Sequence, residues 1–87
     1  MKISVWDTYV TRKDGTIMHF DILVPNNLED EHTIFNYGRE FLTGKPFNTK
    51  GISSTQCSFC HMEQANDAIS AAINKRGYYI IEMENCQ

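Results

Sequence analysis

The residues best suited to chemistry stand close together after the middle of the chain. Cys57, Cys60 and His61 form the pattern C-x-x-C-H, which three kinds of site use. Two such cysteines attach a c-type haem, and the histidine ligates its iron. Zinc takes four Cys or His ligands, and C-x-x-C supplies two of them where the backbone turns between the cysteines. A dithiol of this spacing at the start of a helix exchanges disulfides.

Haem fits this chain least well. A c-type haem is normally attached after export, and residues 1–11 do not have the pattern of a signal peptide because Asp7 interrupts the apolar residues. We therefore expect a cytoplasmic protein without haem. Disulfides are rare in the cytoplasm, so the three cysteines are expected to be thiols or metal ligands.

Zinc and redox chemistry each require a particular local backbone. Cys57 and Cys60 point to opposite faces of a strand but converge in a turn. Zinc also needs a fourth ligand, and the complete candidate set is Cys57, Cys60, His61 and Cys86. A redox pair should begin a helix, whereas the nearest predicted helix begins near Asn66. If neither chemistry occurs, the cysteines are packing residues, because free Cys is commonly buried.

The elements that position these residues follow from periodicity and turn signals. Asp14-Gly15 joins two β-forming segments as a hairpin turn, and Asn residues cap two helices that end at Gly44 and Gly77. The predicted strands cover residues 2–10, 16–24, 56–62 and 78–83, and the helices lie between residues 26 and 44 and between 66 and 77. The predicted fold is an α+β two-layer sandwich, with a mixed, mainly antiparallel sheet and both helices on one face. Its order is β-β-α-β-α-β, or β-β-α-α-β if residues 56–62 do not pair.

A second polar group lies across the predicted hairpin, whose register is open. In one register His19 lies opposite Thr8, and in the other it lies opposite Tyr9, which also sets Asp7 against Asp21. Either register brings a histidine close to a carboxylate or hydroxyl, as general acid–base chemistry requires. Such cross-strand polar pairs are also usual on an exposed sheet face. The candidate polar site is Asp7, Tyr9, His19 and Asp21.

Length and charge limit the classes of function. The 87 residues make one domain, residues 1–87, with a net charge of −3. The eight Lys and Arg residues are dispersed, so no surface for a nucleic-acid backbone is expected. No apolar run approaches the roughly 20 residues that span a bilayer, so no membrane partner is expected either.

Five motifs resemble those of a small bacterial family known only as a domain of unknown function. They are VWDTYV from Val5, the turn Asp14-Gly15, MHFDI from Met18, CSFCH from Cys57 and GYYIIEME from Gly77. Together they extend over nearly the whole chain. The resemblance implies a compact α+β domain and no particular activity.

The hairpin is apolar on both faces, although two helices are too few to cover both. The predicted core is Val5, Phe20, Ile22, Phe41, Ile69, Ile73 and Ile80, and the predicted open face carries Trp6, Val10, Ile17, Leu23 and Ile81. A patch of that size indicates a partner. We expect a homodimer through this face, with His19 and Asp21 near the seam. The alternative is a monomer in which the loop Lys45–Ser54 covers the patch.

Two classes of function remain open. The first is a non-enzymatic binding or protein-interaction module, which we favour because the sequence contains no complete catalytic constellation. The second is a metal- or thiol-dependent protein that uses Cys57, Cys60 and His61 with Cys86. The ligand is not specified by either interpretation.

Overall fold

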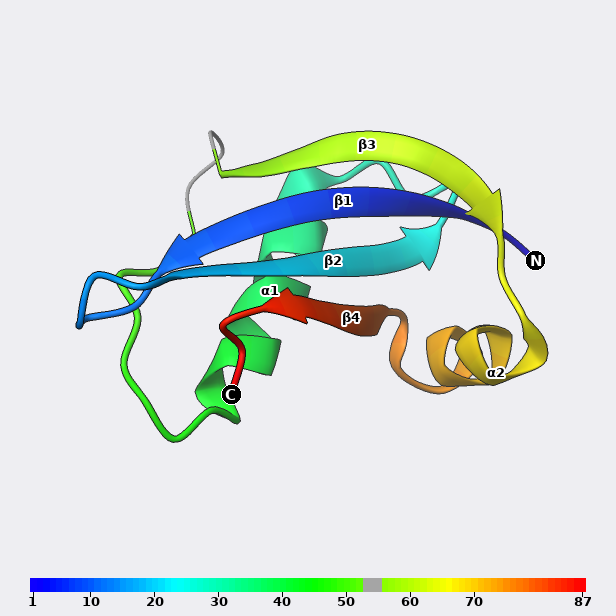
Figure 1. Ribbon diagram of the computed structural model, residues 1–87. Coiled ribbons are helices and arrows are strands. Elements are labelled where there is room, and N and C mark those ends of the chain that lie inside the picture. The colour runs from blue at the N-terminus through cyan, green and yellow to red at the C-terminus, as the bar shows by residue number, and fades with distance from the viewer. Residues whose placement is uncertain (53–55) are drawn as a thin grey trace.

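The structure, a computed structural model, describes residues 1–52 and 56–87 and forms an α+β domain (Figure 1). The order β-β-α-β-α-β is the predicted one, and the strand expected over residues 56–62 forms over Cys57–Gln64. Within the described ranges the elements are β1 (Lys2–Thr11), β2 (Ile17–Pro25), α1 (Glu31–Thr43), β3 (Cys57–Gln64), α2 (Asp67–Arg76) and β4 (Tyr79–Glu84). The last two residues of the predicted loop Lys45–Ser54 lie outside the described residues.

The sheet has the order β3-β1-β2-β4, and each neighbouring pair is antiparallel. The hairpin turn forms as expected: Asp14 accepts a hydrogen bond from the backbone of Thr16, and Gly15 takes a φ of 92°, which glycine adopts without strain. The register pairs Tyr9 with His19 and therefore Asp7 with Asp21. Of the two registers that the sequence allows, the structure has the second.

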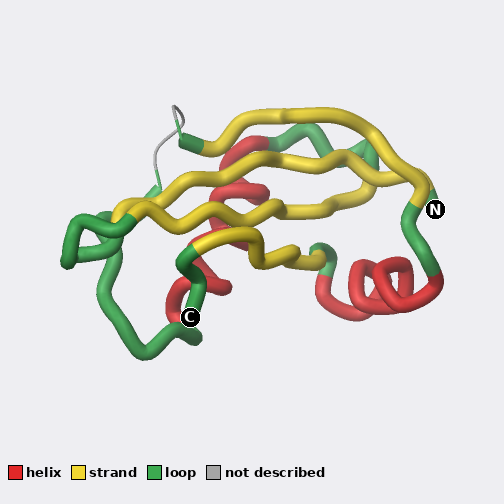
Figure 2. The backbone as a smooth tube through the Cα atoms, in the orientation of Figure 1, coloured by secondary structure: helices red, strands yellow, loops and turns green. Residues whose placement is uncertain are grey.

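Helix α1 lies behind the sheet (Figures 1 and 2) and begins later than predicted. Its N-cap is Asp30, whose carboxylate accepts from the backbone of His32 and from the hydroxyl of Thr33. The predicted caps, Asn26 and Asn27, lie instead in a turn after β2. Asp30 competes successfully because its side chain satisfies a first-turn N–H group that would otherwise lack a partner.

The main core lies between α1 and one face of the sheet, which we call the α1 face. Even-numbered residues of β1 and β2 share this face because side chains alternate along a strand. Gly38 lets the helix approach closely, since a Cβ there would lie 2.5 Å from the end of Ile52 and 3.1 Å from that of Ile22. The fully buried members of this core include Val10, Met18, Phe20, Ile22, Val24 and Ile34.

Helix α2 packs on the opposite face, which we call the α2 face. There Ile73 contacts a second buried cluster with Ile3, Val5 and Leu23. The prediction that both helices cover one face is wrong, and the predicted single core divides between the two clusters. The physical reason is that the odd-numbered residues at one end of the hairpin are also apolar, so a short helix with a narrow apolar stripe can bury them.

Helix α2 lies at the end of the sheet where β1 begins (Figures 1 and 2), and its buried contacts are with residues of that end. The odd positions further along the hairpin carry the partly buried side chains of Asp7, His19 and Asp21 instead of buried apolar residues. Among the described residues, no helix is long and apolar enough to cross a membrane.

The predicted open patch is not a single surface. Trp6 and Val10 are buried on the α1 face, where the Trp6 ring contacts that of Phe59 edge-on at 6.1 Å. The other three members, Ile17, Leu23 and Ile81, occupy odd positions on the α2 face or pair with them, and only Ile17 is largely exposed. The error has the same cause as the helix placement, because the sequence pattern did not assign the faces.

Truncation of Phe20 tests the main core. We expect Phe20→Ala to lower the free energy of unfolding by about 3–5 kcal/mol, because it removes a fully buried ring that also contacts Phe41 at 4.7 Å. Urea unfolding of both proteins measures the loss. Ile17→Ala is the control, since Ile17 lies on the same strand but is 55% exposed. A loss below about 1 kcal/mol for Phe20→Ala would contradict this packing.

Candidate functional site

Four polar side chains from β1 and β2 meet on the part of the α2 face beyond helix α2. Asp7 lies directly opposite Asp21, and Tyr9 lies directly opposite His19. The Nε2 atom of His19 is 3.4 Å from Oδ1 of Asp7 and 3.6 Å from Oδ1 of Asp21. These are the four residues of the predicted polar site, and the register alone brings them together.

The two carboxylates titrate as a pair. Burial, followed by the hydrogen bond and charge of Asp7, raises the pKa of Asp21 to about 6. The hydrogen bond from Asp21 is the largest influence on Asp7, whose pKa it lowers. Two carboxyl groups directly opposite each other cannot both ionise freely, so Asp21 retains a proton to higher pH than Asp7 does. Its buried Oδ1 has no hydrogen-bond partner among the described residues.

The imidazole of His19 is held by its neighbours. The Tyr9 ring stacks on it with a centroid distance of 4.3 Å and an angle of 11°. Only 17% of the His19 side chain is exposed, whereas Tyr9 is 45% exposed. Tyr9 thus covers the ring from the solvent side while Nε2 faces both carboxylates.

A β-bulge brings part of the Cys-rich motif to the same face. Trp6 pairs with Phe59, but Val5 pairs with His61, so Cys60 is the extra residue between them. The bulge places His61 on the same face as Cys60, whereas an unbroken strand would alternate them. Nδ1 of His61 is 3.2 Å from Sγ of Cys60. After desolvation, Asp7 is the next cause of the raised pKa of the Cys60 thiol, so the two predicted groups adjoin.

Glu63 adds a residue that the sequence analysis missed. Its carboxylate pairs with Nε2 of His61 at 2.5 Å, so the imidazole is held between Cys60 and Glu63. The i, i+2 spacing of His61 and Glu63 in a strand was the available signal, because such residues share a face. Desolvation, followed by the charges of Asp7, Asp21 and Glu63, raises the pKa of the Cys60 thiol.

The other two cysteines lie in the main core, on the α1 side. Cys57 is buried and accepts a hydrogen bond from the Thr8 hydroxyl at 3.3 Å. Cys86 is also buried, and its thiol donates to the carbonyl oxygens of Glu84 and His19. Burial raises the pKa of both thiols. Cys57 and Cys60 occupy opposite faces because they are three positions apart in a strand, where side chains alternate.

The structure therefore does not assemble the predicted four-ligand zinc site of Cys57, Cys60, His61 and Cys86. Within residues 1–52 and 56–87, one group offers three potential ligand atoms within 4.8 Å of one another: Asp7, His19 and Asp21. The potential metal ligands that do converge, Asp7, His19 and Asp21, belong to the predicted polar site. Cys60 and His61 border this group.

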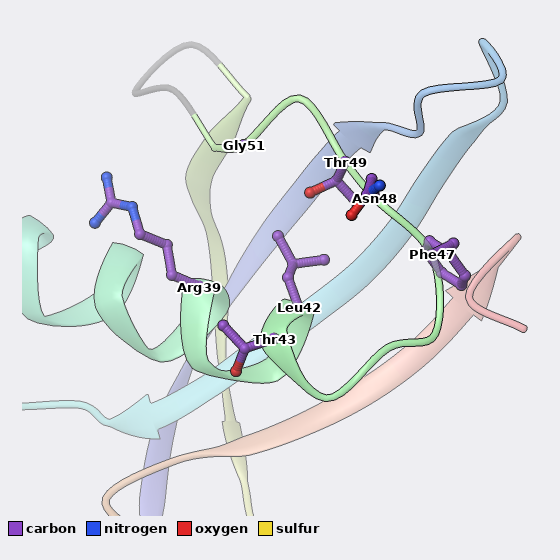
Figure 3. A pocket seen from close by; sticks show the side chains of 7 residues that line it. All are labelled: Arg39, Leu42, Thr43, Phe47, Asn48, Thr49 and Gly51. Atoms are coloured by element: carbon purple, nitrogen blue, oxygen red, sulfur yellow. The ribbon is translucent and has the colours of Figure 1, made fainter.

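A shallow pocket of about 290 Å³ lies on the α1 side, between the end of α1 and the loop after it (Figure 3). The Arg39 side chain points away from Asn48 and Thr49 across the opening, and its guanidinium donates to Asn36 instead. A cation and hydroxyl groups therefore do not converge there. The Asp7–His19–Asp21 group is the stronger candidate site.

The fold and site define a small antiparallel α+β domain with an Asp/His cluster on one half of a sheet face. The chain belongs to the family described as domain of unknown function DUF2024, which matches residues 1–83. The resemblance seen in the sequence motifs is thus confirmed. The chain is also similar to the NMR structure of protein NE1680 from Nitrosomonas europaea, a structural genomics target. The two share 36% identity over 100% of both chains, with a TM-score of 0.80. No curated protein matches the chain.

The raised pKa of Asp21 predicts how stability depends on pH. Between about pH 4 and pH 6 the folded state binds more protons than the unfolded state, so stability falls as pH rises through this window. Asp21→Asn removes this slope. We expect it to stabilise the fold at pH 7, on the order of 1 kcal/mol, and to change stability little at pH 4.

Urea unfolding at both pH values measures these effects. Glu29→Gln, at an exposed position before α1, is the control for loss of one negative charge. If Asp21→Asn and Glu29→Gln changed the free energy of unfolding equally at pH 7, the ionised Asp7–Asp21 pair would not destabilise the fold.

Proposed function

We propose that this domain binds a divalent metal ion through Asp7, His19 and Asp21 on the open half of the α2 face. The observation that carries the proposal is the convergence of one imidazole nitrogen and two carboxylate oxygens within 4.8 Å of one another. The proposal belongs to the second of the two classes that the sequence leaves open, a metal-dependent protein. Its ligand set differs from the predicted one.

The distances favour ligation over hydrogen bonding. Good N–H···O hydrogen bonds measure about 2.7–3.2 Å, whereas His19 lies 3.4 and 3.6 Å from the two carboxylates. With metal bonds of about 2.1 Å, neighbouring ligand atoms in a tetrahedral site lie about 3.4 Å apart. The His19 nitrogen therefore already lies near the separation that an ion requires from each of the two carboxylates.

Electrostatics favours the same conclusion. Like charges directly opposite on neighbouring strands destabilise a sheet, and the raised pKa of Asp21, about 6, reflects burial together with its contact with Asp7. A divalent cation can compensate the charges of both carboxylates. It would also give the buried Oδ1 of Asp21 a partner.

The mixed oxygen and nitrogen ligands indicate the class of ion. Carboxylates suit Mg²⁺, Ca²⁺ and Mn²⁺, whereas imidazole suits the later transition metals. A site with one histidine and two aspartates therefore favours Zn²⁺, Co²⁺ or Mn²⁺ over Ca²⁺. The 35% exposure of the Asp7 side chain leaves one side of the site open to water or to a further ligand.

Calorimetric titration of tag-free protein with Zn²⁺, Co²⁺ and Mn²⁺ at pH 7.5 tests the proposal. We expect binding of one ion per chain and a rise in the melting temperature. His19→Gln and Asp21→Asn should each weaken binding at least about tenfold, while His32→Gln, at an exposed position in α1, should not. Binding should weaken as pH falls from 7 to 5, because protons compete for the same atoms.

Two results would exclude the metal site and leave only a hydrogen-bond network. One is that none of the three ions binds stoichiometrically. The other is binding that His19→Gln and Asp21→Asn both leave unchanged, because the ion would then lie elsewhere on the chain.

We also propose, from the sequence, that the protein is cytoplasmic and forms a homodimer. A dimer through the α2 face is supported by Tyr9 and Ile17, which are 45% and 55% exposed beside His19. Light scattering at micromolar concentration should then give twice the 10.0 kDa chain mass. Tyr9→Lys should lower that mass, whereas Met62→Lys, on the edge strand β3, should not. A mass of one chain at all concentrations would end this proposal.

A further inference from the structure

The thiol of Cys60 is a nucleophilic group beside the Asp/His cluster that the proposed function does not use. Of the three cysteines, all in the described part of the chain, Cys60 alone is exposed. Its sulfur lies 3.2 Å from Nδ1 of His61, and after desolvation Asp7 is the next cause of the raised pKa of the thiol. This side chain borders the cluster on the β3 side, whereas Asp21 and His19 come from β2.

We propose that Cys60 is the fourth ligand of the ion at Asp7, His19 and Asp21, and that the site therefore selects thiophilic ions such as Zn²⁺ over Mg²⁺ and Mn²⁺. This inference rests on the proposed metal site. Three protein ligands leave one tetrahedral position vacant. A thiolate in that position distinguishes zinc-like ions, since Mg²⁺ and Mn²⁺ prefer oxygen ligands.

His61 and Glu63 are placed to support the thiolate. Nδ1 of His61 lies 3.2 Å from the Cys60 sulfur, and Nε2 pairs with the Glu63 carboxylate, so the imidazole is fixed against the thiol. His61 is thus a positioning residue, because it acts on the ion through Cys60.

Binding through Cys60 requires one movement and one proton transfer. The sulfur lies outside the group of atoms within 4.8 Å of one another, so the exposed side chain must change rotamer about its Cα–Cβ bond. The S–H bond breaks, its proton passes to the buffer, and the sulfur lone pair forms the bond to the ion. No oxidant or reductant takes part.

Absorption spectroscopy of the Co²⁺ complex tests for the sulfur ligand directly. We expect a thiolate-to-cobalt charge-transfer band in the near ultraviolet for the wild-type protein. Cys60→Ser should abolish this band but retain the weaker d–d bands of bound cobalt. Cys57→Ser and Cys86→Ser are the matched controls and should retain it. His61→Gln should shift the formation of the band to higher pH.

Alkylation of the unmodified wild-type chain avoids any variant that fails to fold. N-ethylmaleimide should modify Cys60 first, because the other two thiols are buried, and equimolar Zn²⁺ should slow this reaction at least about tenfold. Equimolar Mg²⁺ should not. Peptide mass analysis identifies the modified cysteine.

The two proposals fail in different ways. If wild-type protein bound none of the ions, the proposed function would be wrong and Cys60 would have no ion to ligate. If wild-type protein bound Co²⁺ through His19 without the charge-transfer band, or if Zn²⁺ left Cys60 alkylation unchanged, the Asp/His site would stand. The role of Cys60 alone would then be overturned.

Discussion

The register of the first hairpin is the constraint on which the rest of the structure depends. Thr11 pairs with Ile17, and the pairing continues without a bulge along both strands. Asp7 therefore lies opposite Asp21. The same register aligns the even-numbered apolar residues that α1 buries. Shifting it by one residue would move the whole main core to the other face. The burial of Met18, Phe20 and Ile22 therefore stabilises a pairing that sets two carboxylates against each other.

That arrangement explains why the polar site lies on a helix-covered sheet without being covered itself. The apolar cluster under α2 ends at Val5 and Leu23, and the next odd positions carry Asp7 and Asp21. A longer helix would bury those carboxylates, which costs free energy unless each is paired. The ten residues of α2 thus match the apolar part of the face, and the remaining part stays accessible to a ligand.

The sequence predicted the features that depend on local interactions. The turn at Asp14-Gly15, the cap at Asn66, the stop at Gly77 and the strand through Cys57 each follow from residue type and spacing, and the structure has all four. The faces could not be predicted in the same way. Trp6 and Leu23 are both apolar, and only long-range packing assigns the first to α1 and the second to α2.

The site was predictable in part for the same reason. His19 and Asp7 could be placed together because both registers allowed close polar pairs, whereas the approach of Cys60 required knowledge of which strand pairs with β1. The C-x-x-C spacing itself was misleading here. It brings two cysteines together only where the backbone turns, and β3 is extended, so Cys57 enters the core while Cys60 remains at the surface.

The bulge in β3 resolves this apparent conflict between motif and fold. A regular strand would have left Cys60 alone on the α2 face and turned His61 toward the other face. One extra residue keeps both on the same face, beside Asp7. Bulges commonly re-aim side chains next to functional sites, and this one adds a thiol and an imidazole to a face that already holds two carboxylates and a histidine. The pattern C-x-x-C-H therefore places its last two residues on the α2 face, beside the Asp/His cluster, and its first in the core. The division follows from strand geometry together with a single irregularity in pairing.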